Sequence, residues 1–482
     1  MLFNSFTFLA FFAVVAGVYY GLPHRARWMW LLGASLFFYG TFSVPYLVLL
    51  LGTTLVTHAM GLAIGDATTP GAKRAALTAG VVLVLSALFV FKYYEFFRQS
   101  ADMVLVAAGL GSLQGWPRLS VAAIAGLSFY TFSSVSYLAD VYRGRARPER
   151  HVGRFTLYAS FFPKLLAGPL ERAQPFLDQV DRPLSFDPER VSSGLQQMLW
   201  GLFKKVVIAD RLAGFVDTAY QLPGLASPAD LVLATYFFAF QLYCDFSGYS
   251  DLAIGAARVL GFDLMANFSR PYLSTSIQEF WAARWHLSLS AWLRDYLYIP
   301  LGGSRTSPLR RAVNVMIVFL VSGLWHGANW TFVVWGGANG AYQVISMTAK
   351  RLLGRESGPS SSSSPLGIVV RRVVTFHLVL VTWVFFRAAT LGDAVTVLSR
   401  VGRLLARLPA LLQVRLKSGD VLISVAFIVL LLVVEGLDER KPVWERLRAR
   451  PLPVRWAVYY LLLIALAVLG TWNFQQFVYM QF

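Results

Sequence analysis

The sequence predicts an all-α, polytopic integral membrane protein, and three observations support this. Of its 482 residues, 56% are hydrophobic and 14% are charged, whereas a soluble globular protein averages about 25% charged residues. Apolar runs long enough to cross a bilayer as helices recur along the chain. Basic loops lie between them and account for a net charge of +18, as is typical of cytoplasmic loops in membrane proteins. We therefore expect the basic residues to meet membrane lipid or an anionic cytosolic substrate, and no nucleic acid.

The first third of the chain consists largely of apolar runs. The earliest run has no basic residue before it and no clear cleavage site, so we expect an uncleaved spanning helix and not a signal peptide. The apolar runs of this third are 3–21, 28–40, 45–64, 76–96, 102–115 and 120–139. The arginine-rich loop 143–154 follows them, and we expect it in the cytoplasm.

The middle of the chain predicts segments that do not simply span. Run 155–170 is short and is broken by Pro163, Gly168 and Pro169, so we expect it to be re-entrant or buried in protein. Run 194–220 is amphipathic, and 229–260 is apolar with a polar interruption. From 263 to 311, charged and aromatic residues predict short amphipathic helices at the cytoplasmic interface or dipping into the bundle.

The last third returns to apolar runs. They are 312–335, 331–349, 367–386, 419–436 and 455–472. The Ser/Pro-rich segment 354–366 predicts a flexible loop, and the basic loop 440–455 is expected in the cytoplasm. In total we expect about eleven or twelve spanning helices plus one or two re-entrant segments, in a single transmembrane domain from 1 to 482.

Two of the six histidines are candidates for chemistry. His286 and His326 each lie in a polar, aromatic stretch, RWHLSLSAWLRDY and LWHGANW. The glycines around His326 predict a helix opened around a cavity, where a neutral imidazole can accept a proton from a hydroxyl group. His58 and His377 lie in apolar runs and favour a structural role. We expect no metal site, because the two candidates are 40 residues apart and Cys244 is the single cysteine.

The charged residues in apolar surroundings leave alternatives open. Asp245 and Asp251 must be paired, hydrogen-bonded or protonated, and the candidate partners are Arg270, Arg284 and Arg294. The carboxylates could form a structural ion-pair network or contact substrate. Lysines in two apolar segments could meet donor phosphates or lie at the membrane interface; they are Lys164, Lys204 and Lys205.

Several segments together resemble the membrane-bound O-acyltransferase family, most closely its bacterial alginate O-acetyltransferase-like branch. They are FFPKLLAGPLERA (161–173), GLFKKVVIADRLA (201–213), YCDFSGYSDLAIG (243–255), NFSRPYLSTSIQEFWAARWHLSLSAWLRDYLYIPLGG (267–303) and VSGLWHGANWTFVVWG (321–336), with weaker matches in TWVFFRA (382–388) and the aromatic C-terminus. The chain departs from the family pattern at Lys164-Leu165, where Gln-Leu or Gln-Ile is usual, and at Ala282-Ala283.

The resemblance implies a helical bundle around a tunnel that joins the two faces of a bacterial inner membrane. It places the family's invariant histidine on His326 and its second histidine on His286, as catalytic residues. No cofactor is expected to bind tightly; acetyl-CoA is the expected donor, with a partner acetyltransferase outside the cytoplasm and a polysaccharide acceptor. The residues expected to bind substrate or hold the site together are Asp245, Asp251, Asn267, Arg284, Trp285, Arg294, Asp295, Trp325 and Asn329.

The sequence leaves three other functions open. The same fold could carry out D-alanyl transfer to teichoic acid or O-acetylation of peptidoglycan. A polytopic solute transporter would also have polar residues at membrane depth. A transporter predicts inverted repeats with matching charged residues, and the sequence has no internal repeat.

Overall fold

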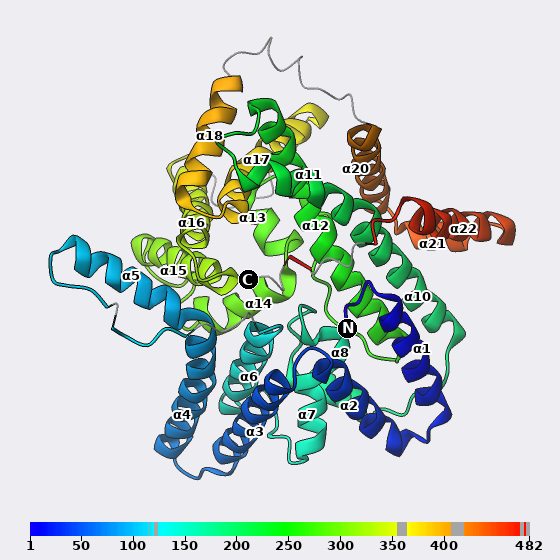
Figure 1. Ribbon diagram of the computed structural model, residues 1–482. Coiled ribbons are helices and arrows are strands. Elements are labelled where there is room, and N and C mark those ends of the chain that lie inside the picture. Colours follow the sequence, from blue (N-terminus) through cyan, green and yellow to red (C-terminus); the bar gives the residue numbers. More distant parts are fainter. Residues whose placement is uncertain (114, 120–123, 354–363, 406–418, 473–476, 479–482) are drawn as a thin grey trace. The chain divides into compact units, whose positions relative to one another are not determined.

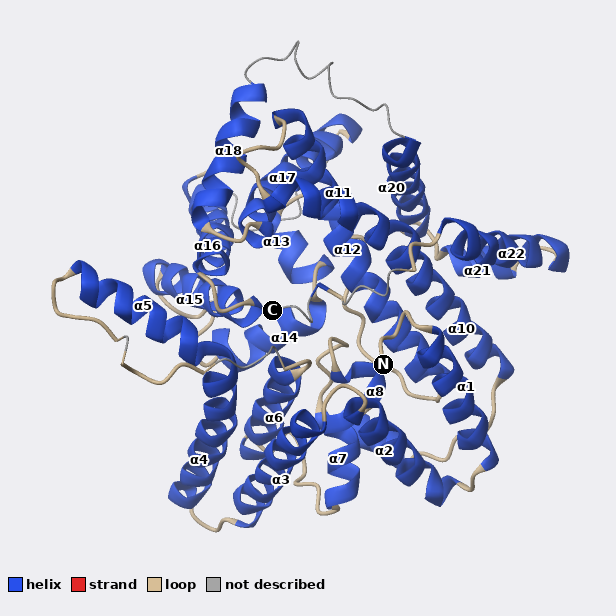
Figure 2. Cartoon of the chain, in the orientation of Figure 1, coloured by secondary structure: helices blue, strands red, loops and turns tan. Residues whose placement is uncertain are grey.

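A computed structural model describes residues 1–482 of this helical protein without 114, 120–123, 354–363, 406–418, 473–476 and 479–482 (Figure 1). Within these residues helices are joined by loops and no strand occurs (Figure 2). Most of the predicted loop 354–366, and part of the aromatic C-terminus, lie outside the described residues.

Six described helical segments are long and apolar enough to cross a membrane. They are Val44–Asp66, Pro70–Ala107, Pro308–His326, Pro365–Arg387, Gly419–Asp438 and Leu452–Leu469. This confirms the predicted all-α, polytopic fold class. The prediction of about eleven or twelve spans also counted shorter apolar runs, such as the one that forms the helix Phe6–Gly21.

The chain divides into two compact units. The first comprises 1–198, 250–265 and 476–482, and the second comprises 199–249 and 266–475. Two helices, α10 (Pro188–Leu202) and α12 (Pro228–Val259), contribute residues to both units. The expectation of one domain from 1 to 482 stays a prediction.

The first unit contains the N-terminal helices. They are α1 (Phe6–Gly21), α2 (His24–Gly40), α3 (Val44–Asp66), α4 (Pro70–Leu88), α5 (Tyr94–Ala107), α6 (Leu127–Tyr142), α7 (Val152–Ser160), α8 (Phe162–Leu165) and α9 (Ala173–Asp181). The run 155–170 does not form one helix, because the chain leaves α7 at Phe161 and re-forms only the four-residue α8, with Pro163 in its first turn. All four residues of α8 are buried, which agrees with a segment enclosed by protein.

The second unit contains the short helices expected between 263 and 311, followed by long ones. They are α11 (Asp210–Gln221), α13 (Ile277–Glu279), α14 (Leu287–Leu293), α15 (Pro308–His326), α16 (Trp330–Leu352), α17 (Pro365–Arg387), α18 (Leu391–Leu405), α20 (Gly419–Asp438), α21 (Val443–Arg448) and α22 (Leu452–Leu469). Wide helical turns at Phe203–Ala209, Phe280–Arg284 and Arg294–Tyr298 adjoin them. Such wide turns often occur at functional sites.

The apolar run 312–335 is two helices and not one opened helix. Helix α15 ends at His326, the backbone is extended at Gly327, and the side chain of Asn329 accepts a hydrogen bond from the Thr331 amide at 3.0 Å to begin α16. The two helices then pack with their backbones in contact (Figure 1). A Cβ atom on Gly323 would lie 2.3 Å from the carbonyl oxygen of Phe332, so only glycine fits there.

One end of the second unit carries many basic side chains, and we call it the basic end. Arg284 and Arg372, the latter near the start of α17, pair with Glu439 just beyond α20 at 3.0 and 2.9 Å. Lys350, near the end of α16, donates to Gln278 at 3.2 Å. Because α15 and α16 are joined by a tight turn at their other ends, α15 begins at this basic end. The arginine-rich segment 440–455 follows α20 there as well.

Candidate active site

A cavity of about 230 Å³ lies within the second unit. Helices α14, α15 and α16 line it, together with the wide turns at Phe280–Arg284 and Arg294–Tyr298. Helix α15 contributes Arg311, Val315, Phe319, Ser322 and His326. Their spacing of three or four residues puts them on one face of the helix, so the lining follows α15 for roughly 22 Å from the basic end.

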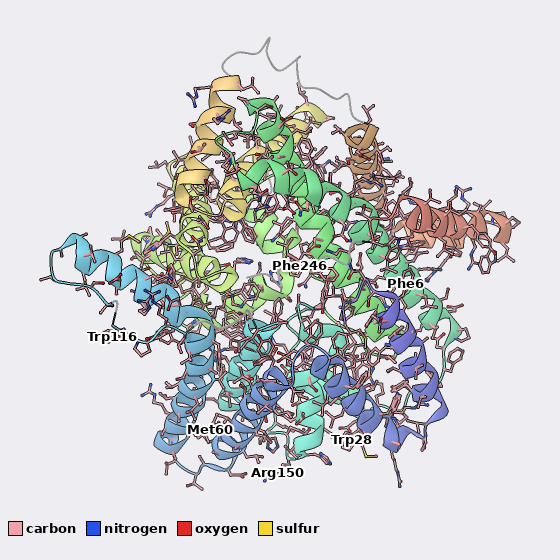
Figure 3. All side chains as sticks on the ribbon, in the orientation of Figure 1. Phe6, Trp28, Met60, Trp116, Arg150 and Phe246 are labelled. Atoms are coloured by element: carbon pink, nitrogen blue, oxygen red, sulfur yellow. The ribbon has the colours of Figure 1, made fainter. Side chains whose placement is uncertain are left out.

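The cavity brings the two candidate histidines together. The ring centroids of His286 and His326 are 6.4 Å apart, and both side chains are buried. The ring of Phe246 (labelled in Figure 3) meets His286 edge-on at 4.7 Å. Trp335 and Phe386 enclose His326 at 4.9 and 5.2 Å. Aromatic walls of this kind exclude water from the imidazoles while leaving them facing a cavity.

Burial keeps His286 uncharged at physiological pH. It lies outside the six apolar spans, and burial lowers the pKa of its imidazole to about 3. The backbone of His286 is left-handed, with a φ of 44°. A neutral imidazole can donate one hydrogen bond and accept another, which suits a group that orients a substrate.

Positive charge lies at the other end of the cavity. Arg294 is mostly exposed and pairs with its neighbour Asp295 at 2.8 Å. Arg311 lines the cavity and is half-buried. Its guanidinium has no ion pair or hydrogen bond to any side chain among the residues described, and Nε is shielded from solvent. Sequence reasoning missed Arg311, although its position fifteen residues before His326 places it on the same helix face.

Comparison with known proteins identifies the family. The model of the membrane-bound O-acyltransferase family matches residues 150–386. The chain is 40% identical to the probable alginate O-acetylase AlgI of Azotobacter vinelandii, over 82% of this chain and 76% of that protein. The chain belongs to the membrane-bound O-acyltransferase family. It is also 34% identical to the peptidoglycan O-acetyltransferase of Helicobacter pylori, over 77% of this chain and 72% of that protein.

A more distant relative has a different acyl group in its name. The chain is 25% identical to the teichoic acid D-alanyltransferase of Bacillus subtilis, over 55% of this chain and 68% of that protein. Together, the family and the alginate O-acetylase relatives make this multi-pass membrane protein an O-acetyltransferase.

Within this acyltransferase, three of the predicted site residues support the histidines from behind the cavity wall. Trp285 is fully buried and stacks on Phe280 at 5.3 Å. Trp325 packs against both histidine rings, at 5.5 and 4.9 Å. Asn267 accepts a hydrogen bond from Ser288 at 2.6 Å. None of these side chains is among those that line the described cavity.

The remaining predicted residues form polar contacts elsewhere in the acyltransferase. Arg284 pairs with Glu279 at 2.6 Å as well as with Glu439. Asn329 caps α16 and donates to the Ala389 carbonyl at 3.1 Å. Asp251 belongs to the first unit, where it accepts a hydrogen bond from Gln197 at 3.0 Å.

The partner predicted for Asp245 was wrong. Lys205, not an arginine, donates to Asp245 at 2.5 Å and to Asp210 at 2.8 Å, and all three side chains are buried. The candidate Arg270 pairs instead with Asp438 at 3.1 Å. These contacts form the structural ion-pair network that was one of the two alternatives for Asp245.

The lysines considered as phosphate contacts are also buried. Lys204 donates to Ser247 at 2.9 Å. In the first unit, the ammonium group of Lys164 lies 3.8 Å from the centre of the Tyr158 ring, a cation–π contact that offsets part of its desolvation. This lysine, at a departure from the family pattern, therefore packs inside the enclosed segment around α8 and is not free to meet a phosphate there.

Proposed function

We propose that this protein transfers an acetyl group from cytoplasmic acetyl-CoA, through its cavity, to a hydroxyl group of an envelope or exported polysaccharide. The observation that carries the proposal is one cavity with two histidines at one end and, at the other, an arginine that pairs with no side chain in the described part of the chain. The two ends suit the two parts of such a donor, a reactive thioester and a nucleotide rich in phosphate.

The charge distribution supports entry of the donor from the cytoplasm. Cytoplasmic loops of membrane proteins carry the excess of Lys and Arg, and the basic end of the second unit has this character. Arg311 lies at that end. We therefore assign the basic end to the cytoplasm and the protein to a bacterial cytoplasmic membrane.

The length of the cavity also fits a coenzyme A thioester. Roughly fourteen bonds separate the first phosphorus atom from the thioester carbonyl carbon, a reach of roughly 16 Å at the geometry of a peptide chain. The lining of α15 from Arg311 to His326 is roughly 22 Å long. After allowing for a contact of about 3 Å at each end, the thioester reaches the histidines when a phosphate meets Arg311.

His326 is proposed as the general base. Its imidazole accepts the proton of the acceptor hydroxyl as the oxygen bonds to the thioester carbonyl carbon. The carbon–sulfur bond breaks, and the leaving thiolate takes that proton from the imidazolium. His286, which stays neutral, orients the thioester by hydrogen bonding. Where the acceptor hydroxyl lies further from the ring, His326 acts as a proton relay for that hydroxyl instead of contacting it directly.

The acceptor is proposed from the relatives. Alginate O-acetylase and peptidoglycan O-acetyltransferase are both named for O-acetylation of a polysaccharide polymer. The higher identity to the former favours an alginate-like exported polysaccharide. A partner acetyltransferase beyond the membrane would complete the transfer to that polymer.

The test is the variant His326→Ala, scored by ester-linked acetate on envelope and exported polysaccharide. Loss of one general base typically lowers a rate by about 10²–10⁴-fold, so we expect acetate to fall to background while the protein remains inserted. His377→Ala is the matched control, since that histidine lies outside the cavity and bonds to Tyr236. Normal acetylation by His326→Ala would refute the assignment.

A further inference from the structure

The backbone at His286 adopts a conformation that needs support. Its φ and ψ are 44° and 54°. Among the described residues, only Arg270 and His286 are non-glycine residues with positive φ. The left-handed region is unfavourable for a residue with a side chain, because its Cβ crowds the following carbonyl oxygen, and such residues persist only where surrounding contacts determine them.

His286 is also the N-cap residue of α14, a position where the side chain normally caps the helix. It is the residue before the first turn of α14, where a side chain usually accepts a hydrogen bond from an exposed backbone amide. The imidazole of His286 makes no such capping bond. Instead it lines the cavity opposite His326.

Asn267 supplies the cap from outside the helix. Its backbone carbonyl accepts a hydrogen bond from the amide of Leu287, the first residue of α14, at 2.9 Å. Its side-chain oxygen accepts the hydroxyl of Ser288 at 2.6 Å. Both Asn267 and Ser288 are buried, so water does not compete for these bonds.

A second backbone bond fixes the chain on the other side of His286. The amide of Ser269 donates to the carbonyl of Arg284 at 2.9 Å. Segment 267–269 thus runs beside 284–287 and holds the chain on both sides of the histidine. Arg284 is in turn anchored to Glu279 and Glu439.

We propose that Asn267 and Ser288 are positioning residues for His286. The backbone carbonyl of Asn267 caps α14 in place of the imidazole. The bond from the Ser288 hydroxyl to the Asn267 side chain ties this carbonyl to the helix, so that the two residues together hold the strained backbone that directs the ring into the cavity. This inference rests on the proposed role of His286 in acetyl transfer. It gives Asn267 a different role from the substrate contact that its sequence context predicts.

The experiment uses the full-length protein in membrane vesicles that contain its polysaccharide acceptor, with release of CoA from acetyl-CoA as the readout. Ser288→Ala removes the hydroxyl and should lower kcat by up to about 100-fold, the scale of a 1 Å misplacement, with KM for acetyl-CoA unchanged. Ser288→Thr keeps the hydroxyl and should retain most of the rate. Ser424→Ala, which removes a buried hydroxyl in α20, should leave both constants unchanged.

A second background separates positioning from general stability. In His286→Ala, a further Ser288→Ala or Asn267→Ala change should lower kcat no more, because the group being positioned is gone. Equal fold-losses in both backgrounds would overturn the inference and leave the proposed function intact. Unchanged activity of His286→Ala alone would refute both the proposed role of His286 and the inference.

Discussion

Replacing Arg311 with glutamine should weaken the binding of acetyl-CoA specifically. The guanidinium lines the cavity at the basic end, and no described side chain pairs with it. Removing its charge therefore leaves no carboxylate of the described residues buried without its cation, and such an unpaired carboxylate is the usual source of large losses in stability. The change acts on an anionic ligand and should leave the fold as it is.

The expected magnitude follows from this geometry. Hydrogen bonds to charged groups contribute about 1.5–3 kcal/mol, and each 1.4 kcal/mol is a factor of about ten in affinity. We therefore expect KM for acetyl-CoA to rise about 10- to 100-fold in Arg311→Gln, with a smaller change in kcat. Acetyl-pantetheine, which has the thioester arm without phosphates, should be used equally by both proteins.

The assay measures CoA or pantetheine release in membrane vesicles at several salt concentrations. Arg310→Gln is the matched control, because this exposed neighbour has the same charge but is not among the residues that line the cavity. Added salt should raise KM for acetyl-CoA more in the wild-type protein than in Arg311→Gln. An unchanged KM in Arg311→Gln, or an equal rise in Arg310→Gln, would refute the phosphate contact.

Two further predictions concern stability. Burial lowers the pKa of His286 to about 3 in the folded protein, below the value of 6.5 expected in the unfolded chain. The contribution of this neutral imidazole to the free energy of unfolding is therefore full above pH 6.5. It is lost as the pH falls toward 3, at about 1.4 kcal/mol per pH unit. The melting temperature of His286→Gln in detergent should fall less over this range than that of the wild type, and equal slopes would contradict the shift. Lys205→Met leaves the carboxylates of Asp210 and Asp245 buried without their cation, and should cost about 3–5 kcal/mol. We expect a marked drop in melting temperature, which should be partly restored when both aspartates are replaced by asparagine. A wild-type melting temperature for Lys205→Met alone would count against the ion-pair network.

Local sequence determined the fold class and the two histidines of the candidate site. The length of an apolar run decides whether a helix can span a bilayer, and proline within a short run interrupts it, as Pro163 does in 155–170. Polar and aromatic neighbours distinguished His286 and His326 from the other histidines. These signals depend on residues close together in the chain, so they can be read without the tertiary structure.

Only the tertiary structure decided how distant residues pair. Asp245 bonds to Lys205, forty residues earlier, although several arginines were equally plausible by charge. The glycines around His326 predicted an opening in the helix of run 312–335, but not that the helix ends at His326, because the turn is stabilised by packing of α15 on α16. The bonds of Asn267 to Ser288 and Leu287 of α14 likewise join residues about twenty positions apart in the chain. Periodicity assigns a residue to a face of its own helix, whereas the packing of helices selects what that face meets.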